Sequence, residues 1–180
     1  DNITVGMFKQ NLELELSRLI EELKDKNYCC RHLRRAYILK PDGDKRPLGI
    51  ACVRDRVVQS AGLILLEPIF EPTFSRYSFA FRPRRHAHQA LEMVRGFIAD
   101  GRSWVVIADI KKCFDNIDHE VLLDLLSKLI GDQDLLSLIR HWLTVDILDF
   151  RELVPIISGV PQGESLSPLL ANIYLDPLDK

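Results

Sequence analysis

The stretch that decides the fold is Ser103–Asp118, SWVVIADIKKCFDNID. An apolar run over residues 104–108 leads directly to the carboxylate of Asp109, and Phe114 follows five residues later. This pattern predicts a β-strand with an acid at its end and a bulky ring just beyond it. Because Mg²⁺ takes one or two protein carboxylates together with substrate phosphates, the strand end is a candidate site for a metal-bound nucleotide. A helix-capping role for Asp109 is the plainer alternative at this point.

The composition fits a globular protein that stays out of the membrane. The chain has 180 residues, 47% of them hydrophobic, which suits one domain or a piece of a larger protein. No apolar stretch reaches the ~20 residues of a membrane span, and the N-terminus, which lacks an initiator Met, shows no signal-peptide pattern. The four cysteines lack the usual spacing of metal ligands, so we expect free thiols in the reducing cytoplasm.

Charge is distributed unevenly along the chain. Residues 31–56 hold eight basic and three acidic side chains, and residues 76–95 hold five and one. Residues 113–180 reverse the balance, with four basic and twelve acidic side chains. A basic half joined to an acidic half is typical of a protein that grips a polyanion beside a metal site, although solvated helix faces account for much of the acidic half.

Apolar periodicity and turn residues predict a helix-rich chain with two hairpins. Residues 34–39 and 46–50 form a basic β-hairpin around the turn at residues 41–44, and residues 146–157 suit a smaller hairpin. Asp118 and Ser167 are expected to cap the helices that follow them. The expected helices cover residues 8–25, 55–70, 86–99, 121–130, 135–143 and 169–178, the second ended by the prolines at 68 and 72.

Six runs in order along the chain resemble the reverse transcriptases of the group II intron (maturase) lineage, which includes relatives attached to CRISPR adaptation proteins. The runs are LKPDGDKRPLGI, DRVVQSA, EPIFEPTFS, FAFRPRRHAHQAL, VVIADIKKCFDNIDH and GVPQGESLSPLLANIYLDPLD. The resemblance implies an α+β, right-hand polymerase fold. Residues 1–102 would form the fingers and template-side region, with the hairpin at about 34–51, and residues 103–180 part of the palm with its incomplete antiparallel sheet.

The resemblance also implies the roles of three residues around the strand end. Asp109 would bind both catalytic Mg²⁺ ions, and Ile110 would add its backbone carbonyl to one of them. Phe114 stands where this lineage places the ring that excludes a 2′-hydroxyl group, so deoxynucleotides would be selected; an ordinary core aromatic is the alternative.

The remaining nucleotide contacts come from the hairpin and from the PQG motif. Lys40 and Arg46 match the lysine and arginine that contact the triphosphate, for which an ammonium and a planar guanidinium are both suited. Gln162 matches the residue that lies against the nucleotide and the template base. A solvated basic hairpin is the alternative for the two cations.

Three arginines follow in the FAFRPRR run, which resembles a template-side loop. Arg82, Arg84 and Arg85 would bind RNA backbone phosphates, contacts that give affinity and register without sequence information. Arg84 stands where the lineage usually has a small residue, so for Arg84 a template contact and a solvent-facing side chain are both open.

The chain ends before the Tyr-x-Asp-Asp hairpin of this lineage, so we expect an incomplete active site and a fragment that is inactive alone. The expected function of the parent protein is RNA-directed DNA synthesis, and the alternative is a maturase-type RNA-binding splicing cofactor. A third, weaker interpretation is an open α/β domain with a ligand at the strand end. The expected partners are RNA template and primer, dNTP, structured intron RNA, a second copy in a dimer, and CRISPR adaptation proteins, in a bacterial or archaeal cytoplasm.

Overall fold

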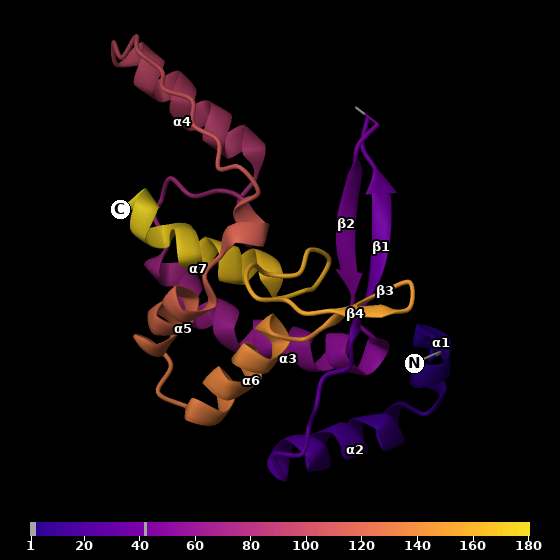
Figure 1. Cartoon of the computed structure of the whole chain (residues 1–180). Helices are drawn as coiled ribbons and strands as arrows, with labels where there is room; N and C mark the ends of the chain where they lie inside the picture. Colours follow the sequence, from indigo (N-terminus) through magenta and orange to yellow (C-terminus); the bar gives the residue numbers. More distant parts are fainter. Residues whose placement is uncertain (1–2, 42) are drawn as a thin grey trace.

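A four-stranded sheet and a group of helices around α3 make up the described residues, 3–41 and 43–180, of the computed structural model (Figure 1). The helices α3, α5, α6 and α7 lie together, and the hairpin of β1 and β2 rises beside them (Figure 1). The elements are α1 (Val5–Gln10), α2 (Leu12–Lys24), β1 (Leu33–Leu39), β2 (Lys45–Ile50), α3 (Val53–Phe70), η1 (Glu71–Thr73), α4 (Ala87–Ala99), η2 (Cys113–Asn116), α5 (His119–Ser127), α6 (Gln133–Leu143), β3 (Ile147–Asp149), β4 (Glu152–Val154) and α7 (Ser167–Asp179).

Both predicted hairpins are confirmed and belong to one mixed sheet. The strand order is β2-β1-β3-β4, with antiparallel pairing inside each hairpin and parallel pairing between β1 and β3. The register of the first hairpin places Ile38 opposite Arg46 and Leu39 opposite Lys45. Asp42, in the predicted turn, lies outside the described residues.

The core lies between α3 and the helices α5, α6 and α7. Leu66 on α3 is fully buried, together with Leu122 and Leu126 on α5 and Ile139 on α6. The helix α3 ends at Phe70 as predicted, but it continues through Pro68 instead of stopping there. A proline in the last turn removes one backbone donor, and the buried ring of Phe70 keeps that turn against the core.

The helix ends agree with the sequence at some positions and correct it at others. Asp118 caps α5 as expected, because its carboxylate accepts a hydrogen bond from the backbone N–H of Val121. Ser167 does not cap α7: its hydroxyl donates to the carbonyl of Pro161 at 2.7 Å, and Leu166 occupies the cap position. The single helix expected over residues 8–25 is two helices, α1 and α2, separated at Asn11.

The strand predicted over residues 104–108 is not formed in the described part of the chain. This segment lies in no helix or strand and is exposed, and the side chains of Trp104 and Ile107 are 94% and 91% accessible. A strand needs a hydrogen-bonded neighbour, and no described strand pairs with this segment. The preceding helix α4 projects away from the other helices (Figure 1). None of the helices that the structure describes is long and apolar enough to span a membrane.

Candidate functional site

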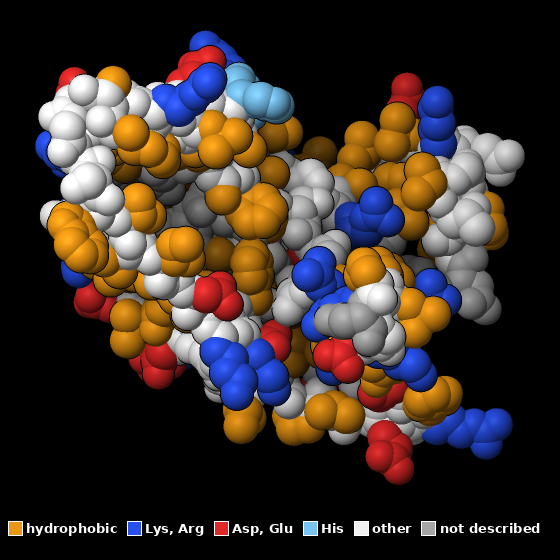
Figure 2. Space-filling view, turned by 90° about the horizontal axis from the view of Figure 1, so that it is seen from above, with side chains coloured by type: hydrophobic (Ala, Val, Ile, Leu, Met, Phe, Trp, Pro, Cys, Tyr) orange, Lys and Arg blue, Asp and Glu red, His pale blue; other side chains and the backbone are white. Residues whose placement is uncertain are grey.

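A cleft of about 890 Å³ lies between the hairpin and the helical part of the chain. The space-filling view from above shows the hollow between these two sides of the molecule (Figure 2). Five residues that the sequence singled out line this cleft, although they come from distant parts of the chain: Lys40, Arg46, Asp109, Phe114 and Gln162. Ile110 follows Asp109 directly in the chain and is about half exposed.

The hairpin places two cations at the cleft, one on each side of its turn. Lys40 follows β1, and its backbone N–H donates to the carbonyl of Asp44 at 2.7 Å, which closes the turn. The ammonium of Lys40 lies 3.9 Å from the Asp44 carboxylate. Arg46 is an exposed residue near the start of β2, opposite Ile38. Two positive groups near the tip of one hairpin suit a multiply charged anion such as a triphosphate.

Two of the carboxylates in the cleft come from the segment after α4. Asp109 and Asp115 both line it, and both are exposed. Among the residues that the structure describes, no three side chains of His, Cys, Asp or Glu gather closely enough to form a metal site of their own. Because Mg²⁺ is held by few protein carboxylates together with substrate phosphates, this donor set fits a shared ion and not an all-protein site.

Phe114 is accompanied in the cleft by a second aromatic ring, which sequence reasoning missed. The ring of Phe81 meets that of Phe114 edge to face, with centroids 6.2 Å apart and an interplanar angle of 85°. Phe81 is 66% exposed and has φ +55°, a conformation that costs free energy for an aromatic residue. The amide of Asn172 on α7 donates to the adjacent carbonyl of Ala80 at 2.9 Å. The signal is present in the FAFRPRR run, in which Phe81 stands directly before Arg82.

The loop over residues 159–163 is fixed to the segment that carries Phe114. The N–H of Gly159 donates to Ile117 and that of Val160 to Phe114, both at 2.8 Å. The Nε2 atom of the buried His119 lies 2.7 Å from the carbonyl oxygen of Gly159. The loop and the Phe114 segment therefore form one hydrogen-bonded unit.

Replacing Gly159 with Ala is expected to destabilise the chain by about 3 kcal/mol. Gly159 has φ +84°, and an added Cβ would stand 2.7 Å from the Phe114 carbonyl oxygen and 2.8 Å from Asp115 Cα. Gly101 is the matched control, because it has φ +90° but no atom within 4 Å of its added Cβ. Urea unfolding of both variants separates the cost of the positive φ from the cost of the steric clash. A loss of stability in Gly159→Ala no greater than that in Gly101→Ala would contradict the clash.

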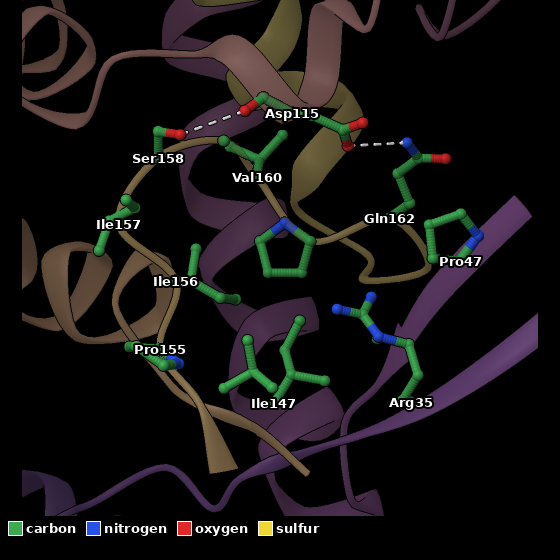
Figure 3. A pocket seen from close by; sticks show the side chains of 14 residues that line it. Arg35, Pro47, Asp115, Ile147, Pro155, Ile156, Ile157, Ser158, Val160 and Gln162 are labelled. Carbon is green, nitrogen blue, oxygen red and sulfur yellow. Dashed lines mark hydrogen bonds between the residues drawn. The ribbon is translucent and has the colours of Figure 1, made fainter. Parts of the chain in front are cut away.

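Gln162 is held by hydrogen bonds through both its backbone and its side chain. Its backbone carbonyl accepts from the N–H of Gly49 at 2.9 Å, and its side-chain Nε2 donates to Asp115 Oδ1 at 3.2 Å. Figure 3 shows this second bond at the edge of a neighbouring cavity of about 310 Å³, into which Arg35 points. Pro47, Asp115 and Gln162 line both the cavity and the cleft, so the two spaces adjoin.

The three arginines expected to bind RNA phosphates differ in their surroundings. The guanidinium of Arg82 is buried and donates to the Glu71 carboxylate and to the backbone carbonyls of Glu71, Ser75 and Ser78. All five of its N–H groups are used, so the expectation for Arg82 is corrected: it holds the loop together. Arg84 is exposed, and half-buried Arg85 donates to the Arg76 carbonyl at 3.1 Å.

Comparisons with known proteins identify the family of the chain. The family model described as "Reverse transcriptase (RNA-dependent DNA polymerase)" matches residues 38–180. The chain is 44% identical over 169 residues to the group II intron-encoded protein LtrA of Lactococcus lactis subsp. cremoris, across 93% of this chain and 28% of LtrA. It is 36% identical over 185 residues to the protein YkfC of Escherichia coli (strain K12), across 100% of this chain and 48% of YkfC.

A solved structure is also similar. A chain of the partial Cas6-RT-Cas1--Cas2 complex matches with a TM-score of 0.64 and 27% sequence identity, across 98% of this chain and 30% of that chain. The chain thus spans less than half the length of each of these three proteins.

Proposed function

Because the chain belongs to the reverse transcriptase (RNA-dependent DNA polymerase) family, we propose that it forms the nucleotide-binding part of an enzyme that copies RNA into DNA. The observation that carries the proposal is the cleft, in which Lys40, Arg46, Asp109, Phe114 and Gln162 meet. The groups in the cleft match the parts of a deoxynucleoside triphosphate. The cations of Lys40 and Arg46 suit its phosphates, the ring of Phe114 suits its sugar, and the amide of Gln162 suits its base. We assign residues 1–102 to the fingers and residues 103–180 to part of the palm.

In the proposed reaction the 3′-hydroxyl of a primer attacks the α-phosphate of the dNTP, and pyrophosphate leaves. Lys40 and Arg46 bind the triphosphate as it develops charge, which lowers the barrier through electrostatic stabilisation. Phe114 lies under the sugar, and Gln162 lies against the base pair between nucleotide and template. The bond between Gln162 and Asp115 orients the amide before the nucleotide arrives.

Mg²⁺ is the proposed cofactor, with two ions in the complete active site. The Asp109 carboxylate and the Ile110 backbone carbonyl are the groups of this chain that would hold it, because Mg²⁺ prefers hard oxygen ligands. When bound, the ions neutralise charge on the reacting phosphates. Asp109 is exposed at the cleft, which leaves its carboxylate accessible to a metal-bound triphosphate.

A second candidate function is that of a maturase-type splicing cofactor that binds structured intron RNA. Exposed Arg84, at the loop between η1 and α4, and the basic hairpin favour it, because phosphate contacts alone give RNA affinity. The similarity to the intron-encoded LtrA supports intron RNA as a partner. The similarity to a chain of a Cas6-RT-Cas1--Cas2 complex supports CRISPR adaptation proteins as a different set of partners.

Primer extension on an RNA template, with Mg²⁺ and dNTPs, tests the proposal in the longest natural protein that contains this chain. Extension that requires the RNA template and dNTPs supports the polymerase. If the folded protein binds RNA but never extends the primer, the polymerase reading fails and the splicing cofactor takes its place. Splicing of an intron RNA with and without the protein then tests that second function directly.

Substituting Phe114 by Val is expected to raise the use of ribonucleotides relative to deoxynucleotides by tenfold or more, on the order of 1.4 kcal/mol. The smaller side chain leaves room for a 2′-hydroxyl where the ring stood. Single-nucleotide extension with dGTP and GTP measures the ratio. Phe97→Val is the control, because Phe97 packs beside Tyr77 and does not line the cleft. An unchanged ratio in Phe114→Val would contradict the proposed gate.

A further inference from the structure

A buried hydrogen bond joins α3 to the loop that carries Gln162. Glu164 follows Gln162 by two residues and is only 7% exposed. Its Oε1 atom accepts a hydrogen bond of 2.8 Å from Nε2 of Gln59, which is 2% exposed on α3. The two residues are 105 positions apart, so this contact exists only in the folded chain.

Gln59 brings a second polar atom into the same buried place. Among the residues that the structure describes, its Oε1 atom is buried without a hydrogen-bond partner. An ionised carboxylate has no hydrogen to donate, so it can satisfy only the amide N–H of Gln59. A protonated carboxyl group can do both, because its carbonyl oxygen accepts from Nε2 while its O–H donates to Oε1. Leaving the amide oxygen unpaired would cost the desolvation of a buried acceptor.

The surroundings of Glu164 also favour its neutral form. Asp55 lies one turn before Gln59 on α3, is 1% exposed, and receives hydrogen bonds from Tyr28 Oη, Arg31 N and Cys52 Sγ. Burial raises the pKa of Glu164 to about 7, with the Asp55 charge adding to the effect and the Gln59 hydrogen bond opposing it. The thiol of Cys30 also interacts electrostatically with Glu164.

Other charged groups share the cleft with Glu164. They are Lys40, Asp44, Lys45, Arg46, Asp109, Lys112 and Asp115. Beside Asp55, the Nε atom of Arg54 lies 3.8 Å from the Asp55 carboxylate.

We propose that Glu164 carries a proton and forms a reciprocal acid–amide pair with Gln59, which makes it a positioning residue for Gln162. Other hydrogen bonds also hold the loop, among them those from the Ser167 hydroxyl to the Pro161 carbonyl and from the Gly49 N–H to the Gln162 carbonyl. The acid–amide pair fixes the loop on the side that follows Gln162. Its consequence for nucleotide binding rests on the proposed function, but the pair itself does not, so it is tested without any polymerase assay.

The protonation state is measured first, by ¹³C NMR titration of this chain with labelled glutamate carboxyl groups. We expect one carboxyl resonance that titrates near pH 7 or above and that is missing from Glu164→Gln. Glu13→Gln is the matched control, because Glu13 is exposed on α2 and its removal should leave that resonance in place. A Glu164 resonance that titrates at or below the ordinary value of 4.5 would overturn the proposal.

The stability profile gives a second and independent result. A carboxyl whose pKa is raised in the folded state binds more protons there than in the unfolded chain. Its stabilising contribution is therefore complete below pH 4.5 and is lost as the pH rises towards about 7. The folding equilibrium constant of the wild type should fall, relative to that of Glu164→Gln, by roughly two orders of magnitude between pH 4.5 and 8. Equal pH dependence in both proteins contradicts the pair.

Hydrogen exchange then reports on the loop itself. Gln at position 164 can donate to Gln59 Oε1 and accept from Nε2, so the conservative variant restores both bonds at every pH. The protection factor of the Gly49 amide should fall at least tenfold more between pH 6 and 8 in the wild type than in Glu164→Gln. If protection at Gly49 changes equally in both proteins, Glu164 does not position Gln162.

Discussion

Replacing Asp109 with Ala is expected to reduce RNA-templated primer extension by a thousandfold or more in the longest natural protein that contains this chain, about 4 kcal/mol in the barrier. Asp109 supplies the carboxylate proposed to hold Mg²⁺ against the triphosphate, and it stands exposed in the cleft beside Phe114. A methyl group provides no ligand for the ion. The measurement is the single-turnover extension rate at saturating dNTP.

The control for this prediction comes from the same segment. Asp118 caps α5, so Asp118→Ala should cost about 1 kcal/mol of stability and leave the extension rate nearly unchanged. Because Asp109 is exposed, Asp109→Ala should keep the unfolding midpoint of the wild type. An Asp109→Ala variant that extends the primer at the wild-type rate would show that Asp109 is not a ligand of the metal. Loss of folding in that variant would show a structural role instead.

Substituting Arg82 by Met is expected to destabilise the chain by about 2–4 kcal/mol, measured by urea unfolding. Methionine keeps much of the side-chain length but removes every donor. The Glu71 carboxylate and the carbonyls of Ser75 and Ser78 then lose their partner. Part of the loss is softened because the Glu71 side chain is 26% exposed and water can reach it.

The matched control is two residues away. Arg84 is exposed, so Arg84→Met should change the stability little. If Arg84 contacts RNA phosphate, the same variant should weaken RNA binding and lower the salt dependence of affinity by about one counterion. The opposite pattern, a stable Arg82→Met variant with reduced RNA affinity, would show that Arg82 binds RNA phosphate and does not hold the loop together.

The sequence was most informative where local chemistry and order along the chain were sufficient. The turn sequence at residues 41–44 between two short strand-like runs was enough to predict the hairpin, because strands joined by a tight turn pair with each other. Asp118 was identified as a cap for a similar reason, since its partner, Val121, is three residues away. The motif order also gave the family, which the match over residues 38–180 shows.

The same reasoning failed where a residue's role depends on distant neighbours. Ser167 precedes a proline and looks like a cap, yet its hydroxyl is taken by the Pro161 carbonyl. Arg82 sits in a basic run, yet burial against Glu71 and three backbone carbonyls uses all of its donors. Residues 104–108 have the composition of a strand, but a strand forms only with a hydrogen-bonded neighbour.

By itself, the sequence determined the two hairpins, most of the helices and five of the residues that line the cleft, since these follow from local periodicity, turn chemistry and motif order. The tertiary structure decided which residues line the cleft and which, such as Arg82, make only structural contacts. It alone placed Phe81 against Phe114 and Gln59 against Glu164. The physical reason is that burial and pairing set the charge and the free donors of a side chain, and both depend on residues brought from far along the chain.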